Sequence, residues 1–411
     1  MSTDDGLAVT TGIARLHDSP GLAGPGRFGL VTHHAGVLPD LRPVAPALLA
    51  AGAPLAALFG PEHGLHGTGQ AGESEAVRFD PGTGLPVHDT YRCAGERLDK
   101  LLIDSGVDAL VYDLQDIGAR FYTYAWTMFD LMVSAARTGV RFVVADRPNP
   151  IGGLVSEGPL LDPAWASFVG RVPIPVRHGL TCGELARHFN ASAVPERAGR
   201  AVELTVIEAV GWRRSLDAEA TGLPWIAPSP NIPTPATALV YPGTCLFEGT
   251  DLSEGRGTTQ PFEIVGAPYL DGRFAPALAE LALPGVHFRD LRYVPAFHKH
   301  AGRPLRGVQL HVTDRVAFAP VRTAVAMLAV LRRLYPDDFA WHTAEGGAEG
   351  TGHRHFIDLL WGSDRLRRAV DAGDDPLPLC GPPAPPGRWA GDDVLLYPAD
   401  LPPRPEGRSR R

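Results

Sequence analysis

Four short apolar segments, each followed at once by polar residues, limit the possible fold of this chain more than any other feature. They are Arg27–His34, Ala53–Phe59, Ala109–Tyr112 and Arg141–Asn149. Unbroken apolar runs are typical of strands buried on both faces of a parallel sheet, and strands that alternate with helices form such sheets. Apolar residues at helical spacing separate these segments, so the sequence predicts an α/β fold with a Rossmann-like, mainly parallel sheet.

The stretch after Ala109–Tyr112 carries the densest set of ionisable and aromatic residues in the chain. It contains Asp113, Gln115, Asp116, Arg120, Tyr122 and Tyr124. Ligands of open α/β sheets bind beyond the carboxyl ends of the strands, so we expect a functional site at this edge. A solvated loop with an aspartate as helix cap is the alternative interpretation.

The length of 411 residues predicts two domains, because one hydrophobic core rarely keeps growing to this size. The proline-rich stretch Trp212–Pro235 is typical of a crossing between domains. We expect a Rossmann-like catalytic domain over residues 1–235, a smaller α+β auxiliary domain over 236–390 and a Pro/Arg-rich tail over 391–411. Composition also predicts poor order for Pro376–Pro386 and for Asp400–Arg411.

Charge and composition argue against several classes of partner. A net charge of -8 is not that of a nucleic-acid-binding protein, which would carry a basic patch. The first residues lack the features of a signal peptide and no apolar run could span a bilayer, so we expect a cytoplasmic protein with no membrane partner. The four cysteines stand far apart without a CxxC pair, which indicates ordinary reduced thiols.

Glu62 is the first candidate for acid-base chemistry. It follows a predicted strand and lies between rigid turn residues, Gly60-Pro61 on one side and His63-Gly64 on the other. A carboxyl group held there can act as a general acid or base, although it could instead cap a helix or pair with an arginine. Asp113 and Asp116 offer the second carboxylate that glycoside hydrolysis by the common route requires.

Histidines near these carboxylates leave a metal site as an alternative. The candidates are His33, His34, His63 and His66. No HExxH or comparable ligand spacing is present, so we expect no metal. A dinucleotide enzyme and a serine hydrolase are also disfavoured, because no GxGxxG follows the first strand and no GxSxG elbow occurs; we expect no cofactor.

Arginines and aromatic residues suggest how a sugar acid could be bound. Arg120 and Arg256 could clamp an anionic group in bidentate fashion, or could pair structurally with acidic residues. Tyr122, Tyr124 and Trp126 alternate along the chain and could form a wall for sugar stacking, or could be packed in the core.

Several long motifs occur in order from about Phe28 to about Ala372. They are Gly60-Pro-Glu-His-Gly64, Asp113 to Tyr124, Asp146-Arg-Pro-Asn-Pro-Ile-Gly-Gly153, Glu157-Gly-Pro159, His178 to Ala186, Pro228 to Thr234 and Tyr241 to Thr259. Together they resemble the signature blocks of the exo-acting β-N-acetylmuramidases of the NamZ type. The resemblance implies a Rossmann-like domain joined to a smaller auxiliary domain, with the active site in the cleft between them.

The resemblance also implies a reaction, the hydrolytic release of N-acetylmuramic acid from the non-reducing end of peptide-free peptidoglycan fragments. Glu62 then acts as acid/base, and Asp116 or Asp113 orients water or stabilises positive charge. Arg120, or as second choice Arg256, holds the lactyl carboxylate. The remaining expected substrate contacts are His63, Tyr122, Tyr124, Asn149 and Glu254. A metal-dependent hydrolase and a muropeptide-binding protein without turnover are the rival interpretations.

Overall fold

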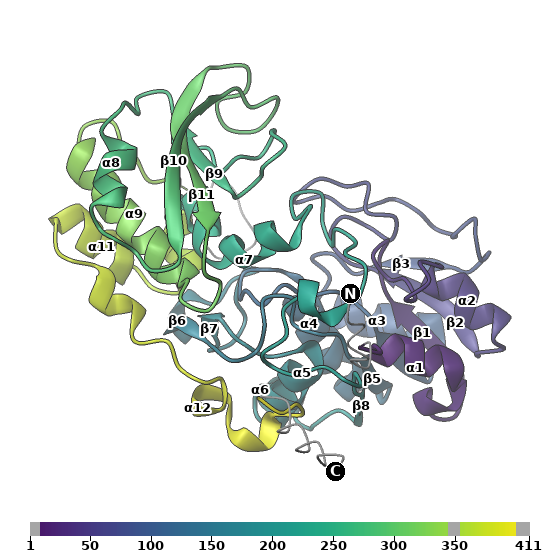
Figure 1. The fold of residues 1–411 in the computed structure, drawn as a ribbon. Coiled ribbons are helices and arrows are strands. Elements are labelled where there is room, and N and C mark those ends of the chain that lie inside the picture. The colour runs from purple at the N-terminus through teal and green to yellow at the C-terminus, as the bar shows by residue number, and fades with distance from the viewer. Residues whose placement is uncertain (1–8, 344–353, 400–411) are drawn as a thin grey trace, which may run out of the picture.

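The computed structural model describes residues 9–343 and 354–399, and a six-stranded parallel sheet organises the first part of the chain (Figure 1). Its strands are β1 (Phe28–Val31), β2 (Leu55–Gly60), β3 (Val87–Asp89), β4 (Ala109–Tyr112), β5 (Arg141–Ala145) and β8 (Leu204–Ile207). Their order is β3-β2-β1-β4-β5-β8, and every neighbouring pair is parallel. Counted along the sheet's own strands this is the 3-2-1-4-5-6 order of Rossmann folds, which confirms the predicted α/β class.

Helices cover both faces of this sheet, and this explains why its strands read as unbroken apolar runs. Side chains alternate between the faces of a strand, so Leu110 and Tyr112 join one core while Ala109 and Val111 join the other. The first core includes α3 (Glu96–Ser105), α4 (Tyr124–Thr138), α5 (Cys182–Ala191) and α6 (Ala193–Ala198). The second includes α1 (Gly12–Asp18) and α2 (Val44–Ala50).

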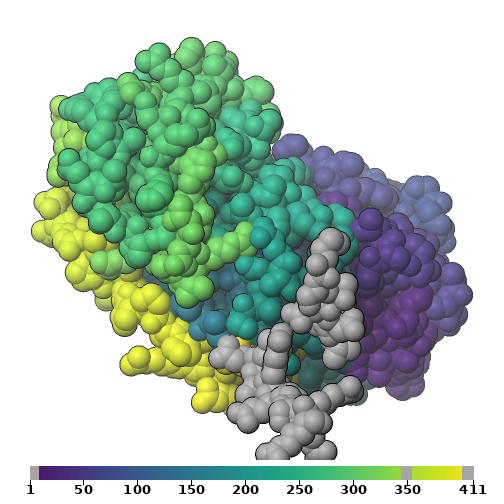
Figure 2. Space-filling model, in the orientation of Figure 1, coloured from purple at the N-terminus to yellow at the C-terminus, as the bar shows by residue number. Residues whose placement is uncertain are grey.

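A three-stranded antiparallel sheet organises the part after residue 235. Its strands, in the order β10-β11-β9, are β9 (Ile264–Ala267), β10 (Val286–Tyr293) and β11 (Leu305–Val312). The helices of this part are α7 (Pro235–Thr244), α8 (Phe274–Ala279), α9 (Pro320–Leu334), α10 (Phe356–Trp361) and α11 (Arg365–Ala372). In Figure 2 most of this part forms the green lobe, and its later residues are yellow. Teal residues lie between the green lobe and the purple lobe formed by the start of the chain.

Shorter elements complete the described chain. A hairpin of β6 (Glu157–Leu160) and β7 (Pro175–Arg177) forms a separate two-stranded antiparallel sheet. The 3-10 helices are η1 (Pro20–Ala23), η2 (Pro163–Trp165), η3 (Glu219–Thr221), η4 (Cys245–Gly249), η5 (Leu377–Cys380) and η6 (Asp392–Val394), and α12 spans Gly387–Ala390. No helix within the described residues is long and apolar enough to cross a membrane.

The expectation of poor order over Pro376–Pro386 is wrong. Ala384 exchanges backbone hydrogen bonds with Ser156 of the parallel-sheet part, at 2.8 and 3.1 Å, and Cys380 is buried. Further on, Tyr397 is buried and donates its hydroxyl to Asp146 over 2.6 Å. The prediction failed because it used proline content alone, and composition does not show which residues of the folded protein this segment contacts. Asp400–Arg411 lies outside the described residues.

Candidate active site

A cavity of about 220 Å³ lies between the two parts of the protein. The parallel-sheet part lines it with residues that include Glu62, Arg92, Tyr122 and Thr123. The part after residue 235 contributes Tyr241, Glu248, Arg256 and Leu360, among others. Because the loops after β2, β3 and β4 all reach this cavity, it opens at the carboxyl edge of the sheet, where the sequence predicts the site.

A tight turn after β2 presents Glu62 to the cavity. The backbone N–H of Gly64 donates to the carbonyl of Pro61 over 3.0 Å, and His63 has a φ of 72°. A positive φ at the third residue is that of a type II turn, where glycine or asparagine is usual. The Nδ1 atom of the His63 ring forms a hydrogen bond with the carbonyl of Gly69 at 3.0 Å. This contact within the same loop stabilises the strained backbone conformation of His63.

Two neutral donors hold the Glu62 carboxyl group. Oε1 accepts from the backbone N–H of Gly72 over 2.8 Å, and Oε2 accepts from the hydroxyl of Thr123 over 2.6 Å. Glu62 is 9% exposed and forms no ion pair with a cation of the described chain. A carboxyl group that is fixed in place, open to a cavity and not paired with a cation has the properties that general acid-base catalysis needs.

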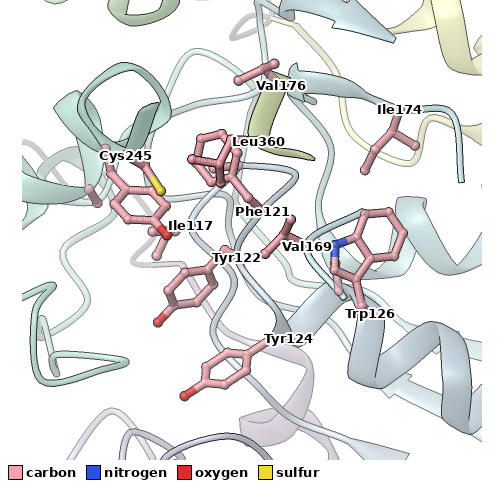
Figure 3. Packing of buried hydrophobic residues seen from close by; sticks show 14 of the residues in the cluster. Ile117, Phe121, Tyr122, Tyr124, Trp126, Val169, Ile174, Val176, Cys245 and Leu360 are labelled. Atoms are coloured by element: carbon pink, nitrogen blue, oxygen red, sulfur yellow. The ribbon is translucent and has the colours of Figure 1, made fainter. Parts of the chain in front are cut away.

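Aromatic side chains form one wall of the cavity. Figure 3 shows two of them, Tyr122 and Tyr124, among the buried residues around them. Tyr122 and Tyr124 lie with ring centroids 4.9 Å apart, and Tyr241 follows at 5.9 Å from Tyr122. The hydroxyl of Tyr124 donates to the Pro228 carbonyl over 2.8 Å, whereas the buried Tyr122 hydroxyl has no hydrogen-bond partner within the described residues. Trp126, the third aromatic residue of the alternating set, lies apart from the cavity and packs on Phe189.

The two aspartates expected beside Glu62 do not line the cavity. Asp113 is fully buried and receives two hydrogen bonds from Arg147, at 2.7 and 3.1 Å. Burial raises the pKa of Asp113, and Arg147 opposes that rise. Asp116 accepts from the Gly118 N–H over 2.6 Å and from Nε2 of His178 over 3.1 Å, so both aspartates are engaged within the protein.

Arg120 is not placed to bind a ligand in this cavity. Its guanidinium is fully buried and donates to the carbonyls of Pro159, Ile174 and Leu360, over 2.8 to 2.9 Å. Burial lowers its pKa, and none of these three partners is an acid. Arg120 therefore connects the parallel-sheet part to α10. Asn149 likewise serves the backbone, with its amide donating to the Leu180 carbonyl over 3.0 Å.

Arg256 does line the cavity, but it is already paired. Its guanidinium lies 2.6 Å from Oε1 of Glu248 and 3.4 Å from Oε1 of Glu254. Glu254 lies behind it, fully buried, with Lys299 at 3.0 Å and His298 at 3.2 Å. Burial alone would raise the pKa of Glu254, but its contacts with Lys299, His298 and Arg256 outweigh burial and the pKa is lowered. The Glu254 carboxylate is thus part of an internal ion cluster.

The histidines proposed as metal ligands face different partners. His34 bonds to the Ala227 carbonyl at 2.7 Å, and His66 lies between Glu75 at 3.0 Å and Asp80 at 3.2 Å. His33 is buried with its ring 5.1 Å from that of Tyr124. Within the described ranges, no three or more His, Cys, Asp or Glu residues are grouped so that they could hold a metal ion.

Residues that sequence analysis did not select complete the site. Thr123 lay inside the selected stretch but carries no charge, so nothing in its type marked it. Gly72 and Arg92 come from loops whose position depends on the pairing of β3 with β2. Asn231 lines the cavity from the Pro228 to Thr234 motif, and that motif was the one available signal for it.

Comparison with known proteins places the whole arrangement in one family. Residues 28–236 match the model described as "Exo-beta-N-acetylmuramidase NamZ, N-terminal", and residues 239–379 match its C-terminal counterpart. A peptidoglycan beta-N-acetylmuramidase NamZ of Bacillus subtilis (strain 168) is 45% identical over 349 residues, which cover 84% of this chain and 80% of that protein.

Solved structures agree with this assignment. Two DUF1343 family proteins from Bacteroides fragilis NCTC 9343 are similar over 95% of this chain and 99% of theirs. Their TM-scores are 0.82 and 0.72, with sequence identities of 33% and 27%. With both family models matched in order and a relative at 45% identity, the chain belongs to the NamZ exo-β-N-acetylmuramidase family.

Proposed function

We propose that this protein is a glycoside hydrolase that releases N-acetylmuramic acid from the non-reducing end of peptide-free peptidoglycan fragments, in turnover and recycling of the cell wall. The position of Glu62 carries the proposal. It is a carboxyl group without a cationic partner among the described residues, and two neutral donors hold it at a cavity between the two parts of a chain that belongs to this family.

Glu62 is the acid/base in this proposal, and Thr123 keeps it in place through the reaction. A general acid must give up its proton and recover it, so its partners have to suit both protonation states. A hydroxyl group can donate to a carboxylate and can accept from a carboxylic acid. The Thr123 hydroxyl, 2.6 Å from Oε2, therefore supports Glu62 before and after proton transfer to the glycosidic oxygen.

The second group of the two-carboxylate route is assigned to Glu248. Asp113 and Asp116 are engaged away from the cavity, whereas Glu248 is the other carboxylate among the described residues that line it. The guanidinium of Arg256 lies 2.6 Å from its Oε1. A carboxylate at this place can stabilise the positive charge that develops on the sugar.

The size and lining of the cavity support exo action on a sugar. About 220 Å³ is less than the roughly 300 to 1,000 Å³ of pockets for drug-sized ligands, so one sugar unit is a better fit than a chain. Tyr122, Tyr124 and Tyr241 provide aromatic surface on which a pyranose ring can pack.

The direct test uses a chromogenic glycoside of N-acetylmuramic acid, with the N-acetylglucosamine glycoside beside it. Release from the first, together with release of N-acetylmuramic acid from the non-reducing end of peptide-free glycan chains, supports the proposal. Binding without release would favour a muropeptide-binding protein. Cleavage within long chains would contradict exo action.

We also propose limits for the domains and a location in the cell. We assign the domain limits to 1–235, 236–390 and 391–411, and the cytoplasm as the location. Limited proteolysis tests the first, with cleavage expected near residue 235. Fractionation of cells that produce the protein tests the second.

A further inference from the structure

We propose that Arg92 reads the lactyl carboxylate, the group that distinguishes N-acetylmuramic acid from N-acetylglucosamine. This inference rests on the proposed function, and it transfers to Arg92 the role that sequence analysis gave to Arg120 or Arg256.

The charges around the cavity single out Arg92. Arg256 also lines the cavity, but Glu248 at 2.6 Å neutralises it, and Arg120 is buried against carbonyl groups. Arg92 lines the cavity, is exposed, and forms no ion pair with a carboxylate of the described chain. A ligand carboxylate would therefore find in Arg92 a cation that does not first have to leave an acidic partner.

Aromatic rings hold the Arg92 side chain without neutralising it. Its guanidinium lies 5.2 Å from the ring centroid of Tyr91 and 5.4 Å from that of Phe168. Contacts of this kind orient a guanidinium plane without using up its N–H donors. One donor of Arg92 bonds to the Tyr91 hydroxyl, and a guanidinium has five in all. The planar fork can then bind both oxygens of one carboxylate.

The backbone fixes Arg92 relative to Glu62. The N–H and the hydroxyl of Thr90 both donate to the carbonyl of Gly60, over 2.9 and 2.8 Å, two residues before Glu62. Arg92 itself has a φ of 49°, a conformation that non-glycine residues rarely adopt and that often marks functional sites. Burial raises the pKa of Tyr91 to about 12, while the charge of Glu62 raises it further and that of Arg92 lowers it, so both groups lie near the Tyr91 hydroxyl.

The test compares the binding of free N-acetylmuramic acid with that of its lactyl amide, by calorimetry, in wild-type protein and in Arg92→Met. Wild type should bind the acid about tenfold to a hundredfold more tightly, as expected for a charge-assisted bidentate pair. Methionine also has a Cβ and an unbranched aliphatic side chain, so it should adopt the positive φ of this position as readily as arginine does. The variant should bind acid and amide alike, and Arg92→Lys should show an intermediate ratio.

Arg97→Met is the matched control, because Arg97 is exposed on α3 close by in sequence and its removal changes the net charge equally. It should keep the wild-type ratio. Equal binding of acid and amide by wild type, no binding of either, or an unchanged ratio in Arg92→Met would overturn the inference. The binding measurement is independent of turnover, so absence of hydrolysis by wild type would count against the proposed function and not against the role of Arg92.

Discussion

The hydroxyl of Thr123 lies 2.6 Å from Oε2 of Glu62, and this contact joins the loops that follow two different strands, β2 and β4. Thr123 is the residue before α4, yet its hydroxyl makes no capping hydrogen bond to that helix. The side chain is therefore available to the carboxyl group. Because the Thr123 hydroxyl contacts Glu62 and does not cap α4, substitutions at Thr123 and Glu62 should change activity more than stability.

Glu62→Gln should abolish turnover while the fold survives. The amide can accept from the Gly72 N–H through its oxygen and donate to the Thr123 hydroxyl, so both contacts persist. Only the titratable proton is lost, which typically costs about a hundredfold to ten-thousandfold in rate. Steady-state kinetics and a thermal melt measure the two effects. A variant that keeps more than about a third of the wild-type rate would contradict the assignment, and the exposed Glu96→Gln serves as control.

Thr123→Val should lower kcat/KM about tenfold to a hundredfold, the typical worth of a hydrogen bond to a charged group. Valine has nearly the same shape, and no helix cap is lost. The melting temperature should therefore change little. Thr123→Ser retains the hydroxyl and should recover most of the activity. If Ser and Val variants behave alike, the hydroxyl has no role in catalysis.

The fold could be predicted from the sequence because its signals are local. Apolar runs between helical segments predict the strands of a sheet buried on both faces, and the four segments selected on this ground contain β1, β2, β4 and β5. β3 was not assigned because its three residues, Val87–Asp89, carry mixed polarity and are half-buried or exposed. α7 was missed because Pro235, Pro242 and Gly243 give it the composition of a loop.

The site could be predicted only in part, because proximity along the chain does not determine where a side chain points. Glu62, Tyr122 and Tyr124 line the cavity as expected, as do His63 and Arg256. Asp113 and Arg120 come from the same stretch as Tyr122, yet Arg147 and the carbonyls of the hairpin and α10 engage them elsewhere. The orientation of these two side chains depends on tertiary contacts with residues that lie far away in the sequence.

EDTA should leave activity intact in protein purified without added metal. The histidines near Glu62 are used within the protein, His34 by the Ala227 carbonyl and His66 by Glu75 and Asp80. Activity on the chromogenic muramic acid glycoside before and after chelation gives the measurement. Loss of rate that zinc or manganese restores would favour the metal-dependent alternative.

Arg120→Met should destabilise the protein by about 3 kcal/mol or more, because three buried carbonyls lose their donor at about 1 to 3 kcal/mol each. Urea unfolding measures the change. Any activity that remains should keep the wild-type ratio of kcat/KM between the glycoside of N-acetylmuramic acid and the glycoside of its lactyl amide. A stable variant that has lost only this preference would show that Arg120, and not Arg92, binds the lactyl carboxylate.

The last prediction concerns Asp146, at the end of β5. It is fully buried and accepts four hydrogen bonds, from the Tyr397 hydroxyl at 2.6 Å, the Thr181 hydroxyl at 2.7 Å, the Gly183 N–H at 2.8 Å and the Arg147 N–H at 3.0 Å. Burial nevertheless raises its pKa from 3.8 to about 6. Between these two values the folded protein binds more protons than the unfolded chain, so this group makes the free energy of unfolding fall as pH rises from about 4 to about 6.

Asp146→Asn removes this dependence. Its oxygen can accept from the N–H groups of Gly183 and Arg147, and its amide nitrogen can donate to the hydroxyls of Thr181 and Tyr397. A shift of about 2 pKa units corresponds to about 3 kcal/mol, so the variant should gain up to that amount relative to wild type as pH rises from 4 to 7. Urea unfolding of both proteins across this range gives the difference, in which the other titrating groups cancel. The exposed Asp104→Asn should show no such trend. If the difference stays flat, or the variant loses stability relative to wild type as pH rises, then Asp146 is stabilised as a carboxylate and its four hydrogen-bond donors outweigh its burial.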